Sequence, residues 1–361
     1  MQGLGCRCAR VDFCADRVRG EVVLLQISVP KPSSATNARA TFALIRLFSV
    51  TFASLVASMS ARMVMQEAPV TQRLPHIAQY TGSKRALAPQ ILGFMPRRFN
   101  RLIEPFAGMA AVSIAAAMES RAQRYHINDL NGPIVGLLGA AIESPSGLAQ
   151  RYADLWQRQF DFPDGHVQHY CRVRDNFNAG EKTAENMLYL LARCVKGSVR
   201  YGKNGGFNQF CDKRRHGAKP QKVAENLAAI SALLKGKTSF SSMDYRQALE
   251  MAQPGDVVYM DPPYQGVSNA RDNRYLAGVG FDDFSGAVEI LDAKGVAYVI
   301  SYDGSCGGRE YGRELPEVLN CTKFMLNAGP SAQATLLGRR ETTVESLYVS
   351  NGLVKAAKCA I

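Results

Sequence analysis

The tetrapeptide Asp261-Pro262-Pro263-Tyr264 contains the residue types with the most specific chemical potential in this sequence. It follows the apolar run at residues 257–260, which has the composition of a buried β-strand. Two consecutive prolines make a rigid corner without N–H donors, so a carboxylate and a backbone carbonyl remain there as acceptors. Two acceptors suit a planar amino group, and the tyrosine ring could stack on the heterocycle that carries the amine. The motif predicts a site for an aromatic amine, although a plain strand-ending turn could use the same residues.

Three further carboxylates stand at the ends of short strand-like segments, at Glu104, Asp129 and Asp244. Glu104 opens the loop Glu104-Pro105-Phe106-Ala107-Gly108, where a glycine lets the backbone approach a ligand closely. Asp129 lies one strand further on, where a carboxylate can accept hydrogen bonds from ribose hydroxyls. Each acid alone could equally cap a helix or sit in a loop. Together with Asp261, they favour a shared ligand site.

Two other groups of residues have weaker signals. Tyr80 and Lys84 precede a helix-forming stretch at 85–92, so the lysine could face a carboxylate or could simply be solvated. His166, His169 and Cys171 are close in sequence, but their spacing fits no common zinc pattern. No CxxC pair occurs among the nine cysteines. We therefore expect no metal and no disulfide scaffold.

The elements that must position these motifs follow from the hydrophobic pattern. Short apolar runs alternate with helix-forming stretches, which predicts an α/β fold with a doubly wound, mostly parallel sheet of about seven strands. In such sheets ligands bind at the carboxyl ends of the strands, where the four acids stand. The predicted strands cover residues 100–103, 125–129, 239–242, 256–260, 296–301, 322–326 and 346–349.

Residues 131–236 separate the second and third predicted strands and are too long for a normal crossover. They include helical patterns at 184–194 and 223–234 and, between these, Asn204-Gly205, a strong hairpin signal. Residues 193–222 hold nine basic residues and one acidic residue, in a chain of net charge +12. The pattern predicts an inserted, mainly helical subdomain with a basic hairpin, whose charge either binds a polyanion or is simply solvated.

The first 65 residues differ from the rest. They contain scattered arginine and serine, and no run of about 20 apolar residues that could cross a membrane. We interpret them as a disordered extension or an upstream mis-called start. The expected catalytic domain then comprises residues 66–130 and 237–355, around the insert at 131–236. The hydrophobic content of 47% excludes wholesale disorder.

Taken together, these motifs resemble the dam-type, amino-group adenine DNA methyltransferases, which use S-adenosylmethionine. The resemblance runs from about residue 78 to residue 351 and preserves the family's order of motifs. It implies the S-adenosylmethionine-dependent methyltransferase fold, with residues 131–236 as the target-recognition subdomain. It also implies methyl transfer to the exocyclic amine of adenine in a specific duplex DNA sequence, after the base is flipped out of the helix.

The resemblance also implies site residues. The catalytic residues would be Asp261, Pro262, Pro263 and Tyr264. The cofactor would be bound by Tyr80, Lys84, Glu104, Phe106, Gly108, Asp129, Asp244 and Asp261. DNA would be contacted by Arg200, Tyr201, Lys203, Asn208, Lys213, Arg214 and Arg215.

The sequence departs from the family pattern at three places, which leaves the DNA recognition site in doubt but not the reaction. Ala110 stands where the family often has glycine, Gly202 stands where it often has asparagine, and residues 209–215 leave the pattern of the GATC readers. The same chemistry on an RNA adenine or a protein glutamine, and a catalytically inactive DNA-binding relative, remain alternatives. We expect a cytoplasmic, bacterial or phage-encoded monomer with no membrane attachment. A cognate restriction endonuclease is a candidate partner, and the recognition sequence stays open.

Overall fold

A computed structural model describes residues 73–161, 165–263, 279–306, 309–311, 314–330 and 342–354. All of these residues belong to one compact unit. The predicted extension at 1–65 and the predicted catalytic Tyr264 lie outside the described residues. None of the helices in the described ranges is both long enough and apolar enough to cross a membrane.

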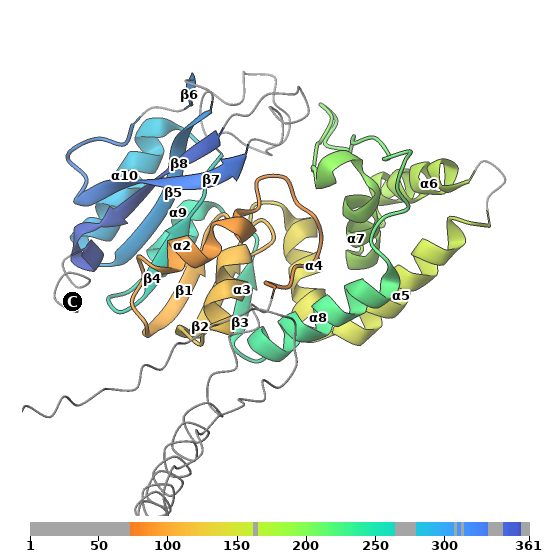
Figure 1. The fold of residues 1–361 in the computed structure, drawn as a ribbon, viewed down its shortest axis with the longest axis horizontal. Coiled ribbons are helices and arrows are strands. Elements are labelled where there is room, and N and C mark those ends of the chain that lie inside the picture. Colours follow the sequence, from red (N-terminus) through yellow and green to blue (C-terminus); the bar gives the residue numbers. More distant parts are fainter. Residues whose placement is uncertain are drawn as a thin grey trace, which may run out of the picture. The chain divides into compact units, whose positions relative to one another are not determined.

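The core of the fold is one mixed sheet, whose first five strands in spatial order are parallel (Figure 1). The five parallel strands are, in spatial order, β3 (Thr238–Ser241), β2 (Ala122–Asn128), β1 (Phe99–Glu104), β4 (Val257–Met260) and β5 (Ala297–Cys306). Beyond β5 the sheet continues with β8 (Thr342–Ser350) and β7 (Cys321–Pro330). Strand β8 is antiparallel to both β5 and β7. The prediction of a doubly wound α/β sheet with about seven strands is confirmed; the short strand β6 (Arg309–Tyr311), which pairs with β5, was not predicted.

The strand order places a topological switch between β1 and β4. The chain builds β1, β2 and β3 toward one edge and then returns to add β4 on the other side of β1. The loops that follow two such strands diverge to opposite faces, which leaves a crevice at their carboxyl ends. Glu104 ends β1 and Asp261 directly follows β4, so both stand at this crevice.

Helices cover both faces of the sheet because its strands are apolar on both faces. Along β4, Val257 packs into one hydrophobic cluster and Val258 into another, since successive side chains of a strand point to opposite faces. The first cluster includes α2 (Ala88–Leu92) and α3 (Ala111–Met118), and the second includes α9 (Tyr245–Glu250) and α10 (Phe281–Ala293). A 3-10 helix, η1 (Lys84–Ala86), precedes α2.

The segment between β2 and β3 is mainly helical and extends beyond the β3 edge of the sheet (Figure 1). Its helices are α4 (Gly132–Glu143), α5 (Pro145–Arg158), α6 (His166–Ala179), α7 (Ala184–Arg193), the 3-10 helix η2 (Val195–Gly197) and α8 (Pro220–Leu234). Buried residues of these α-helices, such as Leu148 and Leu227, share one hydrophobic cluster with Leu102 of β1. The helices therefore pack as a continuation of the sheet's core.

The predicted hairpin forms around Asn204-Gly205. Tyr201 and Phe207 are antiparallel bridge partners, and the N–H of Gly202 donates to the Gly206 carbonyl at 2.8 Å. At the base of the hairpin, the N–H of Asn208 donates to the Arg200 carbonyl at 2.8 Å.

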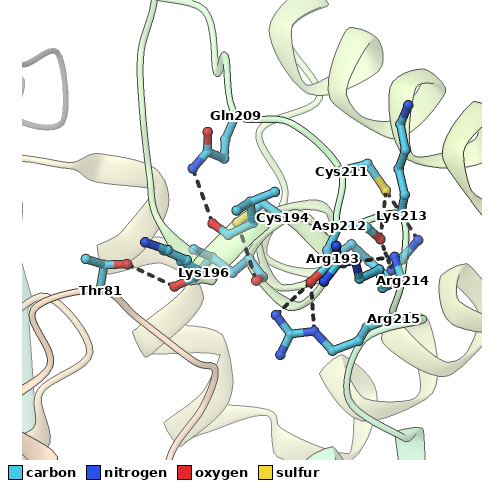
Figure 2. A network of polar contacts seen from close by, with 12 residues as sticks. Thr81, Arg193, Cys194, Lys196, Gln209, Cys211, Asp212, Lys213, Arg214 and Arg215 are labelled. Atoms are coloured by element: carbon cyan, nitrogen blue, oxygen red, sulfur yellow. Dashed lines mark hydrogen bonds and ion pairs between the residues drawn. The ribbon is translucent and has the colours of Figure 1, made fainter. Parts of the chain in front are cut away.

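The turn at η2 is hydrogen-bonded to Thr81, which precedes η1. Thr81 donates its N–H to the Gly197 carbonyl at 3.0 Å. Its hydroxyl donates to the Lys196 carbonyl at 2.9 Å (Figure 2). Gly197 has a φ of +59°, and a Cβ added there would lie 2.2 Å from the carbonyl oxygen of Gln79. Only glycine allows this close approach of two backbones.

Gly197→Ala should therefore lower the free energy of unfolding by at least about 2 kcal/mol more than Gly205→Ala. Gly205 is the matched control because its φ is also positive, +73°, but its added Cβ would meet nothing within 4 Å. Urea unfolding of both variants measures the difference. Equal losses of stability would show that the contact with Gln79 does not constrain the turn.

Candidate active site

A cavity of about 350 Å³ opens at the switch point. It contains ten of the predicted site residues, contributed by segments far apart in sequence: Tyr80, Lys84, Glu104, Phe106, Gly108, Asp129, Asp244, Asp261, Pro262 and Pro263. The sequence analysis did not single out several other residues of its wall, among them Asn131, Ser198, Val199, Met243, Tyr245 and Glu345. The fold thus gathers all eight predicted cofactor-binding residues around one space.

Lys84 joins two carboxylates inside this cavity. Its Nζ lies 2.9 Å from Asp261 Oδ1 and 3.3 Å from Glu345 Oε2, and its side chain is only 9% exposed. Lys84 thus faces a carboxylate, one of the two possibilities that its sequence position left open. Glu345 comes from β8, where a single acid within a β-branched and apolar run was the signal available in the sequence.

Glu104 is the most deeply buried acid of the cavity, at 2% exposure. Burial raises the pKa of Glu104 to about 7, a hydrogen bond from the Ser113 N–H opposes this rise, and the negative charge of Asp261 adds to it. The cavity therefore contains a carboxyl group that changes charge near neutral pH. A cationic ligand group beside it would favour its ionised form.

Asp129 is held by two backbone N–H groups. Gly108 donates to one of its carboxylate oxygens and Asn131 to the other, each at 2.9 Å. Burial raises the pKa of Asp129, and these two hydrogen bonds counteract the effect. Each carboxylate oxygen has two lone pairs, so both oxygens can still accept from a pair of hydroxyls.

The buried side chain of Asn128 connects the ends of three strands. Its amide nitrogen donates to the carbonyls of Pro105 and Met243, at 2.9 and 3.0 Å. Its oxygen accepts from the Met243 N–H at 3.0 Å and from the Ser241 hydroxyl at 2.7 Å. The sequence analysis missed this residue, although a polar side chain at the buried end of an apolar strand was a usable signal.

The loop after β1 carries unusual backbone conformations. Gly108 has a φ of +51°, and an added Cβ would lie 3.2 Å from the Tyr80 ring. Ala110, one of the departures from the family pattern, also adopts a left-handed conformation, with φ 50° and ψ 41°. The ring of Phe106 packs 5.0 Å from that of Tyr245. This loop is tightly held between Tyr80 and α9.

Asp244 caps α9 and pairs with an arginine. It accepts from the Arg246 N–H at 2.9 Å and from the guanidinium at 2.8 and 3.1 Å. The side-chain hydrogen bond from Arg246 is the main cause that lowers the pKa of Asp244. The carboxylate is therefore ionised, and one of its four lone-pair positions remains for a ligand donor.

The predicted DNA-binding residues fall into two groups. Six of them are exposed: Arg200, Lys203, Asn208, Lys213, Arg214 and Arg215. Tyr201 is only 9% exposed, and its hydroxyl donates to the Asn131 side chain at 3.0 Å. It therefore ties the hairpin to the loop that holds Asp129. The guanidinium of Arg215 pairs with Asp212 at 2.6 Å.

The histidines near α6 make aromatic and backbone contacts. The ring of His166 packs on that of His216 at 4.5 Å, and His169 Nε2 lies 2.9 Å from the Leu155 carbonyl oxygen. Within the described ranges, no group of three or more His, Cys, Asp or Glu side chains is placed to hold a metal ion.

Comparison with known families decides the class of protein. The sequence pattern of the D12 class N6 adenine-specific DNA methyltransferases matches residues 80–317, about two thirds of the chain. This chain belongs to that family. The match includes the segments that bring Lys84, Glu104, Asp129 and Asp261 to the cavity, so the family suggested by these motifs is confirmed.

Relatives of this methyltransferase come from different biological settings. It is 29% identical over 195 residues to the Retron Ec67 DNA adenine methylase of Escherichia coli, covering 53% of this chain and 64% of that protein. It is 27% identical over 241 residues to the Type II methyltransferase M1.LlaDCHI of Lactococcus lactis subsp. cremoris, covering 63% and 80%. It is 29% identical over 218 residues to the DNA N-6-adenine-methyltransferase of Escherichia phage P1, covering 58% and 26%.

Among solved structures, the fold is similar to that of a putative methyltransferase from Escherichia coli, with 10% identity over 75% of this chain and 88% of that one. The TM-score is 0.31, too low to add to the family assignment.

The buried carboxyl group of this methyltransferase predicts a pH-dependent stability. Between pH 4.5 and about 7, the folded protein keeps a proton on Glu104 that the unfolded chain has released. The ligand-free protein should therefore lose stability as pH rises through this window, by roughly 3 kcal/mol at about 1.4 kcal/mol per unit. Glu104→Gln removes this contribution. In urea unfolding from pH 4.5 to 8, the free energy of unfolding of the variant should rise relative to that of the wild type. If the two free energies changed with pH in parallel, the pKa of Glu104 would have its ordinary value.

Proposed function

We propose that this chain transfers a methyl group from S-adenosylmethionine to the exocyclic amine of adenine in duplex DNA. The supporting observation is a cavity that the Asp261-Pro262-Pro263 corner shares with Glu104, Asp129 and Asp244. Membership of the D12 family gives the reaction class. The roles of individual residues are our own assignment from the geometry.

The cavity residues fit the chemical groups of S-adenosylmethionine. Asp129 offers two carboxylate oxygens to the ribose hydroxyls, and Asp244 offers an ionised acceptor to the adenine amine. Glu104 is placed to become ionised beside the ammonium of the methionine part. Tyr80 and Phe106 border the space between them. The bound cofactor supplies a methyl group on a positively charged sulfur.

The corner at Asp261 would hold the target amine. Its carboxylate and the Pro262 carbonyl can each accept one N–H of the amine, which favours a tetrahedral nitrogen with a localised lone pair. The ion pair with Lys84 fixes the carboxylate and favours its charged form. Glu345 is a second carboxylate partner of Lys84. We assign Asp261 as the catalytic residue and Lys84 and Glu345 as positioning residues.

The exposed basic side chains favour a nucleic acid over a protein substrate, and the D12 family favours DNA over RNA. Flipping a base out of a duplex costs a few kcal/mol, and phosphate contacts can offset that cost. Arg200, Lys203 and Lys213 are exposed on the hairpin and the loop that follows it. A protein glutamine would bring no phosphates to these cations. The cytoplasmic location, the monomeric state and a restriction partner remain predictions.

Asp261→Ala should abolish methyl transfer while the protein stays folded, because the residue stands at a strand end, outside the core. Activity is measured by sequencing methylated adenines in DNA from a host that expresses the chain. Asp175→Ala, which changes an exposed aspartate on α6, is the matched control and should retain activity. If Asp261→Ala kept even a tenth of the wild-type turnover, the catalytic role assigned to Asp261 would be wrong. If the wild type binds S-adenosylmethionine but methylates nothing, the chain is an inactive relative.

Lys84→Met should reduce the rate of methyl transfer at least tenfold, because Asp261 loses the cation that holds its carboxylate. Glu345→Gln should reduce the rate of methyl transfer less than Lys84→Met, because it leaves the Lys84–Asp261 contact in place. Initial rates and cofactor affinity are measured for both variants, with Lys294→Met, at the C-cap of α10, as the control. An effect of Glu345→Gln on unfolding alone, with unchanged rates, would contradict its positioning role.

A further inference from the structure

Four polar side chains form a ladder between β2 and β3. The parallel register pairs His126 with Ser239 and Asn128 with Ser241. Since alternate residues of a strand point to the same face, these four side chains stand on one face of the sheet. His126 is only 2% exposed and Asn128 is fully buried. A buried imidazole must satisfy its nitrogens within the protein, so its partners define how this ladder is bonded.

The backbone fixes the orientation of the Asn128 amide at the inner end of the ladder. The N–H of Met243 can only donate, so the atom that lies 3.0 Å from it is the Asn128 oxygen. The amide nitrogen then faces the carbonyls of Pro105 and Met243, two residues that line the cavity. The Ser241 hydroxyl lies 2.7 Å from the same amide oxygen and must donate to it.

This orientation determines the tautomer of His126. A serine hydroxyl has one proton, and Ser241 uses it on Asn128, so its oxygen accepts from His126 Nε2 at 2.9 Å. Burial lowers the pKa of His126, so the ring is neutral near pH 7 and Nδ1 is an acceptor. The Ser239 hydroxyl donates to Nδ1 at 2.9 Å, a shorter contact than the 3.3 Å to the Tyr125 carbonyl.

The hydrogen bonds therefore run in one direction, from β3 toward the cavity. Each side chain donates to the next, in the order Ser239, His126, Ser241 and Asn128. Consecutive bonds of this kind polarise one another, and each fixed partner restricts the rotamer of the next. Asn128 is thus held by the ladder on one side and by the cavity loops on the other.

We infer that His126 is a positioning residue for S-adenosylmethionine, an inference that rests on the proposed function. Through Ser241 it fixes the Asn128 amide, and that amide holds the loops after β1 and β3 together. The residues that line the cavity in the described part of the chain do not include His126, so its effect passes through these loops.

Both loops lie on the cofactor side of the proposed site. The loop after β1 carries Phe106, and the loop after β3 carries Asp244. Asp261, the proposed catalytic residue, follows β4 and pairs instead with Lys84. Loss of the His126 contact should therefore weaken cofactor binding, while methyl transfer from the bound cofactor keeps its rate.

The test places two different amides at position 126. The amide nitrogen of glutamine reaches the position of the Nε2 atom of His126, whereas that of asparagine reaches only the position of Nδ1. His126→Asn therefore leaves Ser241 without its donor and should raise the Kd and the KM for S-adenosylmethionine roughly fivefold, with kcat unchanged. His126→Gln should restore most of the lost affinity.

A buried histidine in the helical segment provides the matched control. His169 is 4% exposed, lies on α6 and contacts the Leu155 carbonyl oxygen. His169→Asn should lower the free energy of unfolding and leave the cofactor Kd at its wild-type value. Circular dichroism first establishes a temperature at which every variant is folded. A merely structural role of His126 would lower the number of active molecules, and hence kcat, without changing the Kd of the folded ones.

A double variant tests the route of the effect. If His126 acts through Ser241, adding His126→Asn to Ser241→Ala should weaken cofactor binding no further.

Wild-type cofactor affinity in His126→Asn, equal affinities of the Asn and Gln variants, or additive losses in the double variant would each overturn the inference. A wild type that binds no S-adenosylmethionine would contradict the proposed function instead.

Discussion

The side chain of Asn128 is the constraint on which the candidate site depends. One fully buried amide group satisfies both its donors and its acceptor on the ends of neighbouring strands. Through Pro105 it holds the loop with Glu104 and Phe106, and through Met243 it holds the loop with Asp244. A buried amide without these partners would be costly, so the three strand ends adopt their positions together.

The ion pair of Lys84 with Asp261 completes the arrangement from the other side of the switch point. Lys84 comes before the first strand, Asp261 follows the fourth and Glu345 lies on the last one. Three segments that are remote in sequence thus meet at one ammonium group. Inside a partly water-excluded cavity such a contact is stronger than at the surface, and its partners are held closely.

Sequence reasoning worked where a residue's neighbours decide its position. Glu104 and Asp261 were predictable because apolar residues, Leu102-Ile103 and the run at 257–260, directly precede them and mark the strand ends. Asn128 and Glu345 left a signal as polar residues within strands, but only the fold shows their partners Met243 and Lys84, which are more than a hundred residues away. Tyr201 shows the same limit, because its sequence context suggested an exposed contact and only the fold reveals its bond to Asn131. Tyr264 and the extension at 1–65 lie outside the described residues.

The backbone contact between Gly197 and the chain around Thr81 affects how such proteins can diversify. If recombination replaced the predicted recognition segment, the turn at η2 would be exchanged with it. Residues 79–81, which this turn contacts, would stay behind. A successful exchange would have to move both pieces, although they lie more than a hundred residues apart. If the predicted recognition segment of this chain sets its target preference, a change of target would require both backbone surfaces to change together.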